Sequence, residues 1–193
     1  MKRSAIGLLA GIGLVMVSGN LTAAEVRGCL DVKPLSMLMS PDATRSFSSY
    51  GDETVGTIQF MPTVDGGISI DTQVARIDAT IGVGGLINGY MQAPLFKLGA
   101  AARFHLGKHV TLGPNLALIA VDAFDWTDAD NRVTSFDASA GVMGGLGLTI
   151  GGDRVAFMLD LNGMALEPQT TDGYAVTQSL SGFVLGLGLH IKL

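Results

Sequence analysis

The chain has 193 residues, of which 48% are hydrophobic and only 15% are charged. This length suits one domain, and the composition excludes a disordered chain, which needs high charge and few large aliphatic residues. Seventeen acidic residues outnumber twelve basic ones. That balance excludes a broad basic surface and argues against nucleic acid as a partner.

The first 24 residues have the pattern of a secretory signal peptide. Lys2 and Arg3 precede a short apolar segment at 5–17, and small residues follow at Thr22–Ala24. We expect cleavage after Ala24, which leaves a mature domain of residues 25–193 with 10 basic and 17 acidic residues, a net charge of −7. An uncleaved anchor helix is the alternative, and the short, glycine-interrupted apolar segment disfavours it.

Apolar residues in the mature domain alternate with small or polar ones instead of forming a block. No run of about 18 apolar residues follows the signal segment, so no helix is expected to cross a bilayer. Alternation with a period of two is typical of strands. The predicted strands, in chain order, lie at 32–39, 54–61, 68–84, 95–106, 110–123, 135–150, 155–162 and 181–193.

The connections between these strands are polar and rich in glycine. We expect loops at 40–53, 85–94, 124–134 and 167–178, a hairpin turn at Asp65–Gly66, and short turns at 107–108 and 151–153. The alternation changes phase near Ala75–Arg76, which predicts either a bulge or a break into two strands. Pro114 is expected to cause a local irregularity, because proline cannot donate to a sheet ladder.

Six charged or titratable residues fall on the strand face opposite the large apolar residues: Lys97, Arg103, Asp137, Asp160, His190 and Lys192. A Lys or Arg that faces lipid at mid-membrane costs about 2–4 kcal/mol. The pattern therefore predicts a membrane barrel with these groups inside, where Arg103 or Lys97 could pair with Asp160 or Asp137. An eight-stranded barrel is filled by its side chains, so we expect no open pore.

The closing segment, Ser181–Leu193, completes the pattern. Large apolar residues at every odd position from Phe183 to Leu193 alternate with Val184, Gly186, Gly188, His190 and Lys192. Together with the signal peptide and the alternation of short turns and long loops, it resembles the small outer-membrane β-barrels of the OmpA/OmpX-like superfamily. Their last strand most often ends on Phe, whereas this chain ends on Leu193.

This resemblance is architectural and implies an all-β fold, an eight-stranded antiparallel up-and-down transmembrane β-barrel in a Gram-negative outer membrane. It implies outer-membrane lipids, lipopolysaccharide and the barrel assembly machinery as partners, and a monomer. The function we expect is non-enzymatic, with a structural or surface-interaction role. The alternatives are a lipid-modifying barrel enzyme and a soluble periplasmic lipocalin-like barrel, which would carry its apolar residues inside.

No catalytic, cofactor or metal residue is assigned from the sequence. The three histidines, His105, His109 and His190, lie near predicted turns or strand ends, and no Gly-x-Ser-x-Gly motif is present. We expect His105 and His190 to form hydrogen bonds inside the barrel. Cys29, the only cysteine, is expected to be a free thiol, and lipid acylation is the alternative.

Two features of the predicted loops have alternative interpretations. An acidic cluster comprises Asp122, Asp125, Asp128, Asp130 and Asn131. It is expected to be a solvated loop, with a bound divalent ion as the alternative, because oxygen-rich loops can hold Ca²⁺. The four residues that could belt a membrane interface, Trp126, Tyr50, Tyr90 and Tyr174, all fall in predicted outer loops or strand ends.

Overall fold

A computed structural model describes residues 24–39, 44–47, 51–54, 58–127, 131, 133–171, 174–178 and 180–193. Within these residues the regular structure is entirely β, and no helix is long and apolar enough to cross a membrane. The predicted signal peptide lies outside them except for Ala24, and the first strand begins at Glu25. The main strands are β1 (Glu25–Met39), β4 (Ile58–Phe60), β5 (Thr63–Asp71), β6 (Ala75–Ile87), β7 (Gln92–His105), β8 (Val110–Val121), β11 (Ser139–Gly151), β12 (Val155–Leu166) and β15 (Gly182–Lys192).

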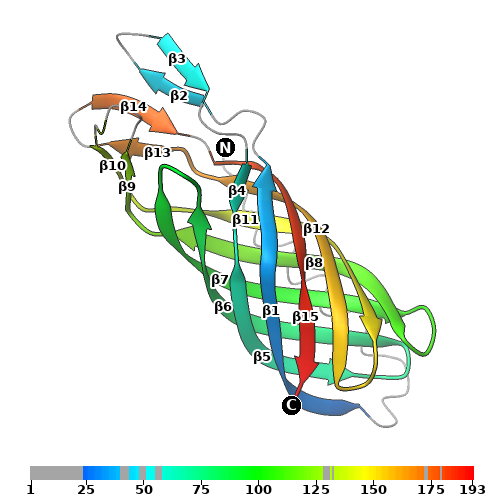
Figure 1. The fold of residues 1–193 in the computed structure, drawn as a ribbon. Coiled ribbons are helices and arrows are strands. Elements are labelled where there is room, and N and C mark those ends of the chain that lie inside the picture. Colours follow the sequence, from blue (N-terminus) through cyan, green and yellow to red (C-terminus); the bar gives the residue numbers. More distant parts are fainter. Residues whose placement is uncertain are drawn as a thin grey trace, which may run out of the picture.

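These strands form one closed antiparallel barrel (Figure 1). Each strand pairs with its neighbours in chain order, and β15 returns to pair with β1. β1 also pairs with both β4 and β5, which flank Met61–Pro62 and together make one wall strand. The wall therefore has eight strands, and the sequence-based prediction of an eight-stranded up-and-down barrel is confirmed.

The two ends of the barrel differ. At the end that holds Glu25 and Leu193, which we name the turn end, short connections at 72–74, 106–109 and 152–154 join the strands. The opposite end, which we name the hairpin end, carries β2 (Thr44–Phe47), β3 (Gly51–Thr54), β9 (Phe124–Thr127), β10 (Val133–Phe136), β13 (Gln169–Thr171) and β14 (Tyr174–Gln178) (Figure 1).

The predicted polar loops are therefore more structured than expected. The segments 40–53, 124–134 and 167–178 were expected to be loops, but each contains residues of short strands. β9 pairs with β10, and the other four form a sheet in the order β13, β14, β2, β3. Hydrogen bonding between the two arms of each connection explains this, since a polar sequence can form strands once a partner strand is adjacent.

Two further connections differ from expectation, and a third agrees with one of its two predicted interpretations. Asp65–Gly66 is not a turn, because β5 runs through it and Asp65 pairs with Asp31 of β1 and Gly82 of β6. The stretch 68–84 breaks into β5 and β6 around Thr72–Val74, which was one of the two interpretations of the phase change. The expected loop at 85–94 is a tight turn at 88–91, where Asn88 Oδ1 accepts the backbone N–H groups of Tyr90 and Met91.

Side chains alternate across the wall as predicted. On β7, Phe96 and Leu98 point outward while Lys97 and Arg103 point inward. Because the large apolar residues face outward, the reversed register of a lipocalin-like carrier is wrong. Asp137 departs from the prediction, because it is exposed in the connection between β10 and β11 instead of facing inward. Pro114 lies within β8 and interrupts its pairing with β7 between Leu112 and Asn115.

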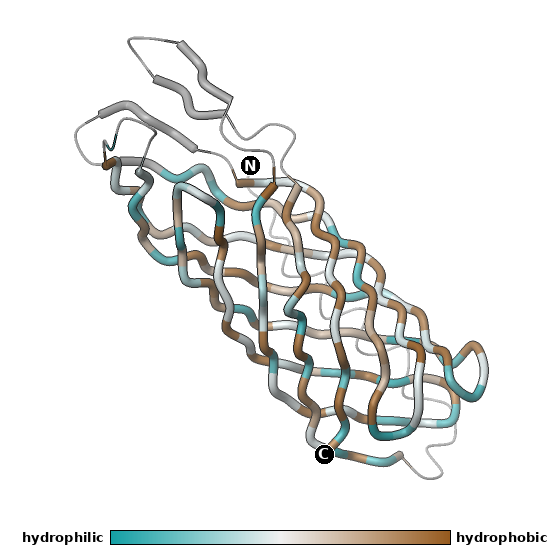
Figure 2. The backbone as a smooth tube through the Cα atoms, in the orientation of Figure 1, coloured by the Kyte–Doolittle hydropathy of each residue, from teal (hydrophilic) through white to brown (hydrophobic). Residues whose placement is uncertain are grey.

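The inward-facing residues divide the interior into two halves, and Figure 2 shows how hydropathy alternates along each strand. The half toward the hairpin end is mostly apolar, although Gln59 and Ser36 are also buried there, whereas the middle and the turn end carry the charged groups. The inward apolar residues of that half include Leu38, Leu86, Ala93, Leu95, Ala117, Ile119, Val121, Met143, Met164, Leu166, Leu180 and Val184. The barrel is therefore packed with a hydrophobic core in one half and a polar core in the other.

Candidate functional site

The centre of the barrel holds a cluster of buried charges, which we name the interior charge cluster. It contains four acidic residues and four basic residues, all buried: Asp31, Asp65, Asp78, Asp160, Lys33, Arg76, Lys97 and Arg103. Burying an unpaired charge is very costly. The equal numbers of acidic and basic groups leave this cluster without net charge, which limits the cost of burying it.

Ion pairs connect the cluster across the barrel lumen. Lys33 Nζ lies 2.6 Å from Asp160 Oδ2 and 3.7 Å from Asp65 Oδ2, and Lys97 also donates to Asp65. These contacts join β1, β5, β7 and β12. Lys97 was predicted to pair with Asp160 or Asp137, but its observed partner is Asp65.

The second part of the cluster centres on Arg103. Its guanidinium lies 2.5 Å from Asp78 Oδ2 and 3.6 Å from Asp160 Oδ1, so the predicted pairing of Arg103 with Asp160 is confirmed. Arg76 Nε lies 3.1 Å from the same oxygen of Asp78. Asp160 therefore links the two parts of the cluster through Lys33 and Arg103.

Glycines make room for two of these carboxylates. Gly82 stands directly opposite Asp65, and Gly147 directly opposite Asp160. A Cβ atom at Gly82 would overlap Asp65 Oδ1, and one at Gly147 would lie 2.5 Å from Asp160 Oδ1. These inward positions must lack a side chain for the carboxylates to reach the lysines and arginines across the lumen.

The space left among these side chains is small. A cavity of about 30 Å³ is lined by Lys33, Asp65, Lys97, Arg103, Asp160 and their neighbours. Such a volume holds about one or two water molecules. The cluster therefore fills the cross-section of the barrel at its middle.

His190 lies where the barrel closes. Its Nδ1 is 2.6 Å from Asp31 Oδ1, and both side chains are buried between β15 and β1. The structure thus places His190 inside the barrel in a hydrogen bond with a protein group, as the sequence predicts. This hydrogen bond joins the first and last wall strands through two residues that are 159 positions apart in the chain.

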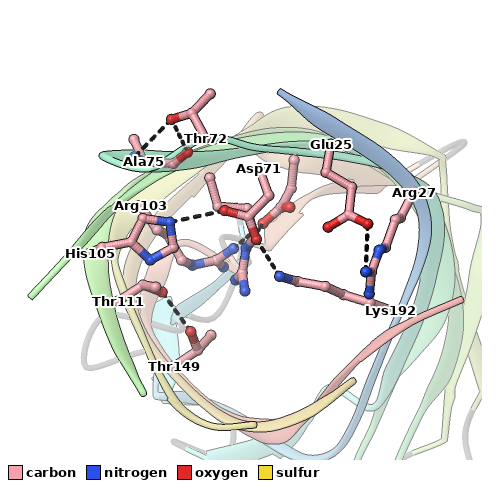
Figure 3. A network of polar contacts seen from close by, with 12 residues as sticks. Glu25, Arg27, Asp71, Thr72, Ala75, Arg103, His105, Thr111, Thr149 and Lys192 are labelled. Carbon is pink, nitrogen blue, oxygen red and sulfur yellow. Dashed lines mark hydrogen bonds and ion pairs between the residues drawn. The ribbon is translucent and has the colours of Figure 1, made fainter. Parts of the chain in front are cut away.

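A second polar group lies at the rim of the turn end (Figure 3). Asp71, the last residue of β5, accepts from Lys192 and lies 2.9 Å from His105 Nε2. His109, which is exposed, contacts the carbonyl of Gly151. Each of the three histidines is thus engaged with a protein oxygen.

Cys29 points into the barrel and is 2% exposed. The four residues before it, Glu25–Gly28, pair with β5 as part of β1. Acylation of Cys29 would require cleavage next to it, which would remove these four wall residues and place a lipid inside the lumen. The free-thiol interpretation fits this geometry.

The hairpin end carries an aromatic cluster. Trp126 stacks on Tyr90, and Phe124 stacks on Phe136, each with ring centroids 5.3 Å apart. Trp126 is only 4% exposed, so its expected role in an interface belt is wrong, because it packs against the turn at 88–91. Tyr50 and the side chain of Tyr174 lie outside the described residues.

Beside these rings lies an open groove of about 630 Å³, which we name the rim groove. It runs between the turn at 88–92 and the β9–β10 hairpin, and its lining includes Asn88, Tyr90, Gln92, Asp125, Thr127 and Ser135. These side chains offer amide, hydroxyl and carboxylate groups next to a half-exposed aromatic ring. Such a surface can bind a polar partner by hydrogen bonds and ring contact.

The acidic cluster of the sequence falls in the same hairpin. Asp122 and Asp125 are exposed, and Asp125 Oδ1 accepts from Ser135 Oγ at 2.6 Å. Asp128 and Asp130 lie outside the described residues, so the geometry of the complete cluster is not defined. Within the described part of the chain, no three His, Cys, Asp or Glu residues gather as metal ligands would.

Sequence reasoning identified Lys97, Arg103, Asp160 and His190 but missed Asp31, Lys33, Asp65, Arg76 and Asp78. Part of this cluster could have been found in the sequence. Arg76 and Asp78 alternate with Ile77 and Ala79, so they lie on the strand face opposite those apolar residues. Asp31 lies just before the predicted strand at 32–39, and Lys33 lies within it, but no inward face was assigned to that strand. Asp65 was assigned to a turn.

Comparison with known proteins finds similar folds among solved structures but no related sequence family. No protein-family model matches the chain, and no curated protein matches it. Among solved structures, the outer membrane protein OprG from Pseudomonas aeruginosa is similar with a TM-score of 0.53 and 8% identity, over 86% of this chain and 96% of that one. Neisserial surface protein A has a TM-score of 0.47 and 14% identity, over 89% of this chain and 99% of that one.

The attachment invasion locus protein Ail of Yersinia pestis is also similar, with a TM-score of 0.41 and 10% identity, over 86% of this chain and 99% of that one. At these sequence identities the similarity concerns the fold alone. The conclusion about the fold rests on the comparison with OprG, whose TM-score is above 0.5. The closed wall and the outward apolar face agree with it. The chain has the fold of a small outer-membrane β-barrel of eight strands.

Proposed function

We propose that this protein is a non-enzymatic β-barrel of a Gram-negative outer membrane, without an open pore, whose hairpin end interacts with partners outside the cell. The interior charge cluster is the observation that carries this proposal. It fills the middle of the lumen and leaves a cavity of only about 30 Å³. A filled lumen favours a structural or surface-interaction role over transport through the barrel.

The outward face supports the membrane location. Large apolar side chains on every wall strand are exposed, including Ile81, Leu98, Leu118 and Leu146, each more than half exposed. In water such a surface would be an aggregation hazard, whereas in lipid it is the expected outer face. Outer-membrane lipids and lipopolysaccharide would surround it, the barrel assembly machinery would insert it, and the barrel would be monomeric.

The rim groove is the part of the hairpin end best suited to a partner. It combines polar side chains with the exposed face of Tyr90, and it is open to the outside of the barrel. Asp125 lies in the groove, but the histidine and the carboxylates inside the barrel lie elsewhere. His190 is buried in a hydrogen bond with Asp31, and the other carboxylates of the interior charge cluster are buried in ion pairs, away from the groove.

Two measurements test this proposal. In cell envelopes, the mature protein should remain with the outer-membrane fraction after carbonate washing, and its gel mobility should change on boiling in detergent. In a planar lipid bilayer, the purified protein should give no stepwise conductance. Release as a soluble species would overturn the membrane location, and regular conductance steps would overturn the closed lumen.

A further inference from the structure

A hollow in the outward face of the barrel lies where two glycines meet. Gly144 of β11 and Gly163 of β12 are directly paired, and both stand at outward positions. The same row of the sheet continues to Leu116 of β8 on one side and Phe183 of β15 on the other. Two side chains are therefore missing between two large apolar ones.

The resulting space, which we name the wall groove, is about 540 Å³, and its lining includes Leu116, Val142, Gly144, Gly163, Ala165 and Ser181. A Cβ atom added at Gly163 would meet nothing within 4 Å, whereas one at Gly144 would lie 3.3 Å from Leu116 Cδ1. Gly163 is thus the open floor of the groove, and Val142 and Ala165 form its border toward the hairpin end.

The chemistry of the lining points to an apolar occupant. Ser181 contributes the only polar side chain among the lining residues, and its hydroxyl already contacts the N–H of Leu166 at 3.0 Å and the carbonyl of Leu166 at 3.3 Å. Nothing in the lining would hold a phosphate or a sugar. The groove also lies in the half of the wall near the hairpin end, because β11 begins at Ser139 and β12 ends at Leu166.

We propose that the wall groove binds an acyl chain of a membrane lipid in the leaflet next to the hairpin end. This inference rests on the proposed membrane location and adds a defined lipid site to it. In a bilayer, the apolar material that surrounds a barrel wall is acyl chain. An empty groove would leave its lining atoms without dispersion contacts, and tight packing is what drives association between apolar partners in lipid.

A second copy of the chain is the competing occupant, and the size of the groove disfavours it. A stable protein interface involves about 20–30 residues on each side. The wall groove is a gap left by two residues and is bordered by projecting side chains such as Leu116, Val142 and Phe183. A single flexible chain fits such a gap better than a broad surface does.

The test uses two matched substitutions in the full chain. Gly163→Leu fills the floor of the groove, while Gly66→Leu adds the same side chain at another outward strand position where a Cβ also meets nothing within 4 Å. Each protein is reconstituted in phosphatidylethanolamine and phosphatidylglycerol vesicles that contain a small fraction of phospholipid with a diazirine on its acyl chain. After illumination, mass spectrometry locates the labelled residues.

In the wild-type protein, we expect residues 142–144 and 163–165 to be labelled more heavily than the outward residues of β7. In Gly163→Leu this excess should fall about fivefold, the change that a packing difference of about 1 kcal/mol produces, whereas Gly66→Leu should keep it. Ala165→Phe, which narrows the groove from its border, replaces Gly163→Leu if that variant shows no folded band on unboiled gels.

Three results would overturn the inference. The first is uniform labelling of the wall in the wild type, and the second is an excess that survives filling of the groove. The third is a protein–protein cross-link through these residues, which would assign the groove to a second copy. If the wild type is not retained in vesicles after carbonate washing, the membrane location fails as well, so the two failures are distinguishable.

Discussion

His190 and Asp31 face each other across the junction of the last and first wall strands, with 2.6 Å between Nδ1 and Oδ1. This contact joins residues from opposite ends of the chain at the place where the barrel closes. Both side chains are buried, so each depends on the other for a hydrogen-bond partner. The closure of the wall is therefore coupled to a specific polar pair.

The first prediction concerns this pair. His190→Ala should lower the free energy of unfolding by about 3–5 kcal/mol, because it leaves Asp31 buried without its partner. Urea titration in detergent, followed by the loss of the fast-migrating gel band, measures it. A double-mutant cycle with Asp31→Ala should give a coupling of at least about 1 kcal/mol. The exposed pair Glu25–Arg27 is the control. If the coupling energy of His190 and Asp31 were as small as that of Glu25 and Arg27, the proposed role of the buried pair would be contradicted.

The second prediction tests whether the interior charge cluster behaves as one network. Asp160→Leu should destabilise the barrel by about 3–5 kcal/mol, because Lys33 and Arg103 lose a shared buried carboxylate. Adding Lys33→Met removes the excess positive charge, so the double variant should be more stable than Asp160→Leu alone. Equal stability of the single and double variants in urea titration would show that Lys33 and Asp160 are not coupled.

The third prediction tests which face of the wall meets lipid. Leu98→Arg, near the middle of β7, should cost about 2–4 kcal/mol in bilayer-inserted protein, and Leu106→Arg in the turn should cost about 0–1 kcal/mol. Both leucines are more than half exposed. Refolding titrations into lipid vesicles compare the variants. Equal small effects at both positions would mean that Leu98 faces water.

The fourth prediction concerns the glycine that stands opposite Asp65. Gly82→Ala should destabilise the barrel, because its Cβ would overlap Asp65 Oδ1 and push this carboxylate from Lys97. Overpacking of this kind costs about 1–3 kcal/mol. Gly66→Ala, one position along β5 from Asp65 but outward and open, is the matched control and should be close to neutral in the same urea titration.

Much of the barrel could be predicted because strand periodicity is a local property. The outward positions of Phe96 and Leu98 and the inward positions of Lys97 and Arg103 follow from alternation and from the cost of placing charge in lipid. Five wall strands from β7 onward were located in this way. These inferences needed no knowledge of which strands become neighbours.

The tertiary structure decided what depends on neighbours. Asp65–Gly66 has the composition of a turn, yet it lies within a strand because β1 and β6 satisfy its backbone on both sides. The polar connections became strands for the same reason. The contacts of Lys97 with Asp65, of His190 with Asp31 and of Gly144 with Gly163 all join residues of different strands. Strand register sets such contacts, and alternation along one strand carries no information about the register between two.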